Sequence, residues 1–217
     1  MDMSQTTKRN TIIGESDGPT SVFILKKNIK LTLRQKIEKW KYKVKRLYIE
    51  KTIKPNSHSI NEVIDYIVNV YGFIELDKDE VQQEYNEMRT SFIMQYASEL
   101  LGEYATIPQL KSELSEDIQL YMKQLQERQQ RAMEIPKEKF DIDFHKFQLS
   151  FDDINDNIHI TIEKRFDYIG AGASGDKKVM KRFHRIYKDV YRYYGVTNQD
   201  IENKSKRYEQ VVRALIH

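Results

Sequence analysis

The segment from Gly170 to Gly175 has the spacing of a phosphate-binding loop. Its residues, Gly-Ala-Gly-Ala-Ser-Gly, match the pattern G-x-G-x-x-G. Glycines let backbone amides approach a phosphate closely, and a helix that starts directly afterwards would add its positive end. The candidate phosphate-binding residues are Gly170, Gly172, Gly175, Lys177 and Lys178. The preceding strands read as antiparallel and no strand follows the helix, so the context does not match a dinucleotide fold. We therefore favour a flexible connection between a strand and a helix.

Acidic and histidine side chains alternate with apolar ones in the same third of the chain. If the two alternating segments pair, one side carries carboxylates and imidazoles, which divalent metals bind. These residues are Asp141, Asp143, His145, His159, Glu163 and Asp167. The outward face of any amphipathic strand gives the same set, and we favour that interpretation. We accordingly expect no metal site and no cofactor.

No other residue pattern indicates catalysis. The chain has no cysteine, which excludes thiolate zinc sites, iron–sulfur clusters, disulfides and cysteine nucleophiles. It contains no nucleophile elbow, no H-E-x-x-H and no Walker motif. We therefore predict no catalytic residues and favour a protein that is not an enzyme.

Positive charge is concentrated between residues 26 and 54. Twelve lysines and arginines against two glutamates give this segment +10, whereas the whole chain carries +3, which leaves −7 elsewhere. The candidate basic surface comprises Lys36, Lys39, Lys41, Lys43, Lys45 and Arg46. Nucleic acid binds such surfaces through its phosphates, and Trp40, Tyr42 and Tyr48 are available for base stacking. A partner protein or an anionic membrane would also fit. Alternatively, the apolar stripe packs into the core and the lysines face water or the acidic remainder of the chain.

A short motif stands near the N-terminus. Residues 14–23, Gly-Glu-Ser-Asp-Gly-Pro-Thr-Ser-Val-Phe, followed by Lys26, resemble a motif of the β subunit of sodium-ion-translocating decarboxylases. In that membrane family the Asp-Gly-Pro-Thr segment lies in a broken transmembrane region and its aspartate is implicated in sodium transport. By position, the resemblance implies this role for Asp17. Short, uncharacterised bacterial proteins carry the same signature ahead of a charged helical body, and this chain resembles them more.

The resemblance covers about fifteen of the 217 residues. Because no apolar run approaches the roughly 20 residues of a membrane helix, we do not expect a sodium pump. The motif either shapes a turn or docks onto a partner. Its candidate binding residues are Gly14, Asp17, Gly18, Pro19, Thr20 and Phe23.

Hydrophobic periodicity predicts an α+β fold that is mainly α. Apolar residues at steps of four and three predict a helix over 32–53, which ends before Pro55. A capping box at Ser59–Glu62 starts a second helix, which Gly72 ends. Two longer helices, over 78–102 and 113–134, are expected to pack antiparallel.

The C-terminal third is expected to hold a small antiparallel β-hairpin and a helix pair. Alternation predicts one strand over 140–151 and a second over 158–168. Helices follow over 176–194 and from Thr197 or Asn198 onwards. Two β-prone runs, residues 11–14 and 20–25, flank a turn at 16–19 and predict an N-terminal hairpin or a strand after a tight turn. This segment or residues 73–76 are candidates for an additional strand of the C-terminal unit. We divide the chain into an N-terminal turn or hairpin segment (1–30), a helical region with a basic first helix (31–135) and a β-hairpin with two helices (136–217). The last two regions form either one domain or two.

Composition and charge favour a soluble, cytoplasmic protein, because cysteine and a secretory signal are absent. We expect a non-enzymatic binding or adaptor protein that uses the N-terminal motif and the basic helix. Nucleic-acid binding through that helix is the alternative, and a phosphate- or nucleotide-handling enzyme is a third. The partner protein and the oligomeric state stay open.

Overall fold

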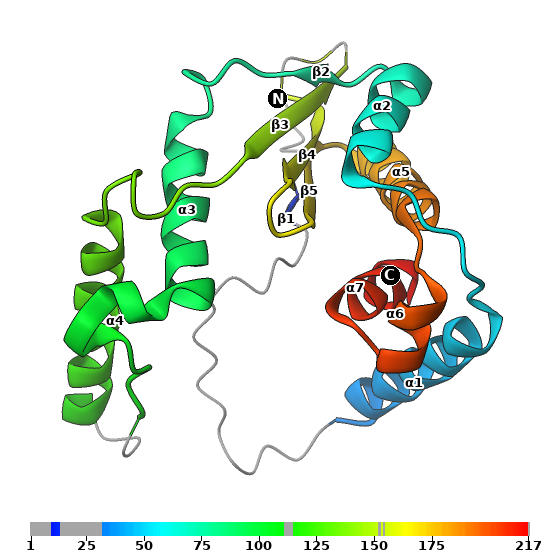
Figure 1. Cartoon of the computed structure of the whole chain (residues 1–217). Helices are drawn as coiled ribbons and strands as arrows, with labels where there is room; N and C mark the ends of the chain where they lie inside the picture. Colours follow the sequence, from blue (N-terminus) through cyan, green and yellow to red (C-terminus); the bar gives the residue numbers. More distant parts are fainter. Residues whose placement is uncertain (1–9, 14–31, 111–114, 152, 154, 217) are drawn as a thin grey trace, which may run out of the picture. The chain divides into compact units, whose positions relative to one another are not determined.

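The computed structural model describes residues 10–13, 32–110, 115–151, 153 and 155–216 (Figure 1). The chain forms an α+β fold that is mainly α, as expected. Its described residues divide into two compact units. The first, called here the sheet unit, contains residues 10–13, 32–75 and 145–216. The second, the helical unit, contains residues 76–144. The division therefore places the expected helical region partly in each unit.

The sheet has five strands in the order β1-β5-β4-β3-β2. The strands are β1 (Asn10–Ile13), β2 (Ile74–Glu75), β3 (Phe144–Ser150), β4 (Asn157–Glu163) and β5 (Tyr168–Gly175). β5 lies between β1 and β4 and pairs antiparallel with both, and β2 pairs antiparallel with β3. Residues 11–13 and 74–75 thus both add a strand, and residues 11–13 pair with β5. The second run of the expected N-terminal hairpin, residues 20–25, lies outside the described residues.

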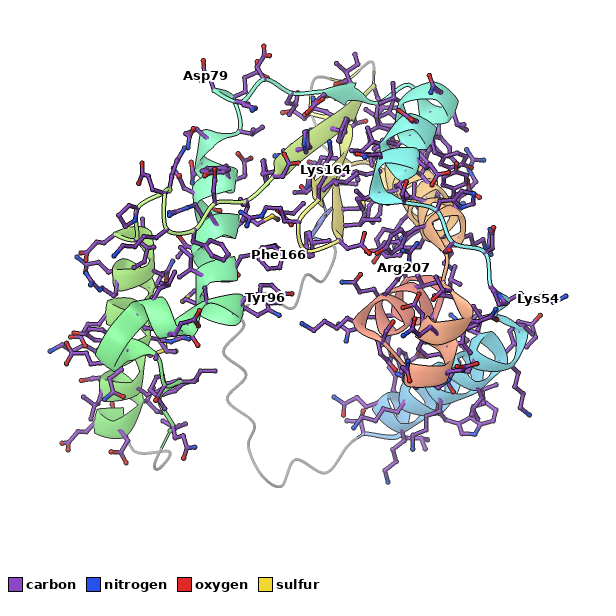
Figure 2. All side chains as sticks on the ribbon, in the orientation of Figure 1. Lys54, Asp79, Tyr96, Lys164, Phe166 and Arg207 are labelled. Atoms are coloured by element: carbon purple, nitrogen blue, oxygen red, sulfur yellow. The ribbon has the colours of Figure 1, made fainter. Side chains whose placement is uncertain are left out.

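Two sequence-based expectations for this sheet are wrong. The expected strand over 158–168 is interrupted by a turn at residues 164–167, where Asp167 has a φ of 53°. Figure 2 labels Lys164 and Phe166 in this turn, and the buried Glu163 carboxylate accepts a hydrogen bond from the Phe166 amide at 2.6 Å. The expected strand over 140–151 begins only at Phe144.

The glycine-rich segment is not a loop but strand β5. Its lack of side chains makes room for neighbours on the sheet. A Cβ atom added at Gly172 would lie 2.5 Å from Nε2 of His159, its partner on β4. Glycine weakens a strand unless another group approaches the backbone closely, and here the His159 ring does.

Five helices belong to the sheet unit: α1 (Leu33–Thr52), α2 (Ile60–Tyr71), α5 (Lys177–Tyr194), α6 (Asn198–Asn203) and α7 (Lys206–Ile216). The predicted capping box of α2 is present, with Ser59 and Glu62 bonded to each other's backbone amides. Gly72 ends α2 in the left-handed region, with a φ of 75°. The predicted boundaries of α1, α2 and α5 are confirmed to within about two residues.

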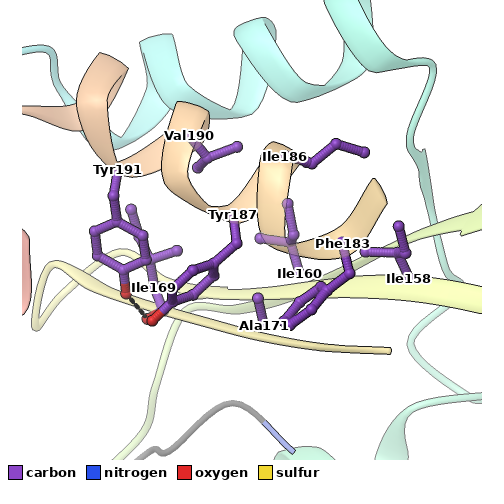
Figure 3. A pocket seen from close by; sticks show the side chains of 9 residues that line it. All are labelled: Ile158, Ile160, Ile169, Ala171, Phe183, Ile186, Tyr187, Val190 and Tyr191. Atoms are coloured by element: carbon purple, nitrogen blue, oxygen red, sulfur yellow. Dashed lines mark hydrogen bonds between the residues drawn. The ribbon is translucent and has the colours of Figure 1, made fainter. Parts of the chain in front are cut away.

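The core of the sheet unit forms where α5 packs on β4 and β5. Figure 3 shows Phe183, Ile186 and Val190 of α5 above Ile158, Ile160 and Ile169 of the strands. All six side chains are buried, and the space between them has no room for a water molecule. A close-packed interior of this kind is the main source of stability in a small domain.

Arg207 of α7 links three segments of the sheet unit. Its guanidinium donates hydrogen bonds to the carbonyl oxygens of Gly195 (2.9 Å), Tyr194 (2.5 Å) and His58 (2.7 Å). It also lies 3.8 Å from the centre of the Tyr194 ring. These bonds join α7 to the end of α5 and to the segment before α2.

The helical unit contains α3 (Gln82–Tyr96), the 3₁₀ helix η1 (Ser98–Tyr104) and α4 (Ser115–Met133). α3 and α4 run antiparallel, as predicted (Figure 1). The helix expected over 78–102 is shorter, because the backbone leaves helical geometry at Ala97. The core of the helical unit consists of Ile93, Met94, Leu101, Ala132 and Ile135.

Two buried arginines connect segments of the helical unit through hydrogen bonds to backbone carbonyl oxygens. Arg89 donates hydrogen bonds to the carbonyl oxygens of Phe140 (2.8 Å) and Ile135 (2.5 Å). Arg128 donates to those of Tyr104 (3.0 Å) and Met94 (2.9 Å). Their guanidinium groups therefore satisfy backbone carbonyls that the irregular segments leave outside regular helix bonding.

Candidate functional site

One face of α1 attaches the helix to the rest of the sheet unit. Ile49 packs against the core, as does Ile53 just beyond the helix end. The Arg46 guanidinium lies 2.8 Å from a carboxylate oxygen of Glu50 and 2.8 Å from one of Glu209 on α7. Lys45 donates a hydrogen bond to the carbonyl oxygen of Ile216 at 3.2 Å. α1 is thus held against α7 through the C-terminal half of one face (Figure 1).

The apolar stripe of α1 lies on the opposite face. An α-helix turns by about 100° per residue, so the stripe lies about half a turn away from Arg46, Ile49 and Ile53. Its side chains are 45% to 75% exposed: Leu33 75%, Ile37 45%, Trp40 65%, Val44 45% and Leu47 57%. Every residue from 33 to 45 is exposed. Among the described residues, the stripe therefore belongs to neither hydrophobic core.

Lysines border the stripe on both sides. Helical geometry places Lys36, Lys39 and Lys43 along one edge and Lys41 along the other. Lys41 lies 3.1 Å from Glu38, in an exposed pair. In the part of the chain that the structure describes, Lys36, Lys39 and Lys43 have no carboxylate within ion-pair distance. Eight basic and two acidic residues give α1 a charge of +6.

The predicted basic surface is thereby divided between two faces. Lys36, Lys39, Lys41 and Lys43 surround the apolar stripe, whereas Lys45 and Arg46 lie on the side of α7. Lys45 also lies near Lys188 of α5. Burial, together with the charges of Lys45 and Arg192, lowers the pKa of Lys188. We call the stripe and the four bordering lysines the outer face of α1.

The five residues of the predicted phosphate site have other roles in the structure. Gly170 and Gly172 lie opposite Thr161 and His159 of β4, and Gly175 lies opposite Asn10 of β1. The exposed Lys177 and Lys178 do begin α5, as predicted. However, the Asp176 carboxylate accepts hydrogen bonds from the amides of Lys178 (2.7 Å) and Val179 (2.9 Å). The amides that would bind a phosphate at this helix end therefore already hold a carboxylate.

The six acidic and histidine residues are divided between the two units. Asp141 and Asp143 belong to the helical unit, whereas the other four belong to the sheet unit. His145 Nδ1 lies 2.5 Å from a carboxylate oxygen of Glu75, and Asp167 accepts a hydrogen bond from Tyr194 at 2.5 Å. The described residues contain no group of three or more such side chains arranged to hold a metal ion.

The N-terminal motif lies outside the described residues, together with its candidates Gly14, Asp17, Gly18, Pro19, Thr20 and Phe23. The described strand β1 ends directly before it, at Ile13. Within the described chain, no helix combines the length and the apolar character needed to cross a membrane.

A tyrosine cluster around Asp189 was not predicted. The hydroxyl groups of Tyr66 and Tyr71 on α2 donate to the same Asp189 oxygen, at 2.5 Å and 2.6 Å. Tyr193 stacks on Tyr66 at 4.0 Å and on His58 at 3.8 Å between ring centres. The bond to Asp189 raises the pKa of Tyr66, and burial and the same carboxylate raise that of Tyr71. The sequence contains one indication of this cluster: Asp189 is the single acidic residue of α5 and lies among basic and apolar residues.

No protein-family model matches this chain, and neither the curated proteins nor the solved structures include a match.

Proposed function

We propose that this protein is a non-enzymatic binding or adaptor protein that contacts its partner through the outer face of α1. The observation that carries the proposal is the exposed apolar stripe of Leu33, Ile37, Trp40, Val44 and Leu47 with lysines along both edges. Scattered exposed apolar side chains are ordinary, but a contiguous stripe of five is typical of an interaction surface. The opposite face is anchored on α7, so the stripe is presented in a defined orientation.

The N-terminal motif is the second part of this proposal. Asp17, Gly18, Pro19 and Thr20 form the segment that resembles the decarboxylase β subunits. We assign it a role in docking to the same partner rather than in ion transport. The support for this assignment is the sequence motif.

Nucleic-acid binding is the second candidate, and it uses the same helix. Trp40 and Tyr48 are 65% and 66% exposed among the lysines, which is an arrangement that binds single strands by stacking and phosphate contacts. Such binding weakens steeply as the salt concentration rises, because counterions are released from the phosphates. A salt titration with RNA therefore separates a nucleic-acid partner from one bound mainly through the apolar stripe.

The proposal is tested by cross-linking in the native host. A photoreactive amino acid replaces Val44 at the centre of the stripe in the full chain. The control carries it at Leu120, which is 49% exposed on α4. We expect position 44, but not position 120, to form an adduct with one defined lipid, nucleic acid or protein. Equal cross-linking at both positions, or none at position 44, would contradict the proposal.

A further inference from the structure

We propose that the outer face of α1 docks on an anionic lipid surface. This inference rests on the proposed function, since it names the partner of the same surface. The helix would lie parallel to the bilayer plane, with its apolar stripe among the acyl chains and its lysines at the level of the headgroups. Amphipathic helices with an apolar face and a lysine-rich polar face bind membranes in this way.

The shape of the surface fits a flat partner. α1 contains 20 residues, which corresponds to a length of about 30 Å. The exposed stripe extends from Leu33 to Leu47, over most of that length. Because the contacts with α7 lie on the opposite face, the stripe can reach a plane without α1 leaving the sheet unit.

The distribution of charge fits a uniformly anionic plane. Lys36, Lys39 and Lys43 border one edge of the stripe, and Lys41 borders the other. A partner must therefore present negative charge on both sides of an apolar strip. A bilayer with anionic headgroups does so at every position, and long lysine side chains reach its headgroups while their stems remain in apolar surroundings.

The apolar stripe favours a membrane over nucleic acid. Phosphates would neutralise the lysines, but they offer no apolar surface to Leu33, Ile37 or Leu47. Burial of such side chains is favourable in proportion to the apolar area removed from water. A lipid surface removes this area from water and neutralises the lysines at the same time.

Trp40 allows a direct test, because it is the only tryptophan of the chain and lies in the stripe. The full protein is titrated with vesicles of phosphatidylglycerol and phosphatidylcholine, and with vesicles of phosphatidylcholine alone. We expect a blue shift of the Trp40 emission with the anionic vesicles only. Lipids brominated on their acyl chains should quench it. No shift and no quenching at low salt would overturn the inference, as would Trp40 emission that is already blue-shifted and shielded from acrylamide without vesicles.

Paired variants separate the contributions of charge and stripe. Lys36→Gln with Lys43→Gln should weaken vesicle binding about fivefold for each lysine, and roughly thirtyfold together. The matched control, Lys78→Gln with Lys123→Gln, removes the same charge from exposed sites of the helical unit and should leave binding unchanged.

Leu33→Gln with Leu47→Gln should weaken binding by about tenfold or more. Its control is Leu120→Gln with Met122→Gln on α4. Equal losses in a pair and its control would contradict docking through α1.

The outcomes distinguish this inference from the proposed function. If an RNA oligonucleotide shifts the Trp40 emission and vesicles do not, the partner is a nucleic acid and the inference is overturned while the binding function stands. If vesicles leave the Trp40 emission unchanged and position 44 cross-links to one protein, the partner is a protein. The inference is then also overturned while the binding function stands. If position 44 gives no adduct, both fail.

Discussion

Helices α1 and α5 have similar sequences and opposite surroundings. α5 carries seven basic residues and one acidic residue, so both helices have a charge of +6. Both repeat apolar residues at steps of three and four. α5 nevertheless buries seven residues, namely Val179, Met180, Phe183, Ile186, Val190, Tyr191 and Tyr194, whereas α1 buries none. Helical periodicity thus shows which side chains share a face, but it does not show what that face contacts.

The difference between the two helices lies in the width of the apolar face. On α5, several apolar residues occupy each turn and cover the isoleucines of β4 and β5 (Figure 3). On α1 the stripe has about one residue per turn, and lysines begin directly beside it. A wide apolar face is typical of a helix that packs in a core. A lysine-rich polar face next to an apolar face with leucine and tryptophan is typical of a helix that lies at a membrane interface.

The largest expected effect comes from truncating one apolar residue on each helix. Phe183→Ala should lower the free energy of unfolding by about 3–5 kcal/mol, because it leaves a cavity between α5 and the sheet. Leu47→Ala should lower it by less than about 1 kcal/mol, because Leu47 is 57% exposed. Urea denaturation of the two purified variants measures both values. Comparable losses of unfolding free energy in the two variants would show that the outer face of α1 is covered in the free protein. The contrast drawn here between α1 and α5 would then be wrong.

A smaller loss is expected when the tyrosine cluster loses its acceptor. Asp189→Ala removes the oxygen to which Tyr66 and Tyr71 donate, and should lower the free energy of unfolding by about 2–3 kcal/mol. The matched change on α1 is Glu38→Ala, whose carboxylate forms one exposed pair with Lys41. We expect less than about 0.5 kcal/mol there. Thermal denaturation of both variants under the same conditions measures the two losses of stability. A larger loss for Glu38→Ala than for Asp189→Ala would contradict the prediction.

Much of this fold could be predicted from the residues, and the errors have physical causes. The capping box at Ser59, the stop at Gly72 and the amphipathic pattern of α5 specify local structure directly. The turn at 164–167 was missed because Phe166 and Tyr168 continue the alternation of β4 across it. The glycine-rich residues 170–175 predict a loop because glycine is common in turns, whereas Gly172 makes room for His159 on the sheet.

The candidate site was predictable in its residues but not in its exposure. The stripe and its lysines are visible in the sequence, and so is the equally basic α5, which was not singled out. Which of the two is covered depends on the sheet, since β4 and β5 present their apolar face to α5. Long-range strand pairing of this kind is not encoded in the periodicity of either helix.

Alkaline pH should loosen the contacts of α5. The pKa values of Tyr66, Tyr71, Tyr191 and Tyr194 are all raised, with burial as the main cause for all but Tyr66. In the unfolded chain tyrosine loses its proton near pH 10. The stability that these tyrosines contribute is thus complete below about pH 10 and is lost as the pH rises towards their folded values. Urea denaturation at about pH 8 and about pH 11 should show this decrease.

The control for this prediction is Tyr66→Phe with Tyr71→Phe. This variant keeps the stacked rings but has no hydroxyl groups to ionise at Asp189. It should be less stable than the wild type at neutral pH and should lose less stability on going to alkaline pH. An identical alkaline loss in both proteins would place the sensitive groups elsewhere.

The smallest expected effect concerns the ion pair that holds α1. Arg46 and Glu209 form a part-buried contact between α1 and α7. The hydrogen bond to Glu209, followed by the one to Glu50, raises the pKa of Arg46. A double-mutant cycle with Arg46→Gln and Glu209→Gln should give a coupling energy of about 0.5–1 kcal/mol that shrinks at high salt. The Phe183→Ala loss should not shrink, because burial is not screened by ions. Hydrogen exchange should show faster exchange in α1, but not in α5, for either single variant. If α1 exchange is unchanged and the coupling is zero, then Ile49, Ile53 and the Lys45 hydrogen bond hold the helix, and its orientation on α7 does not depend on this ion pair.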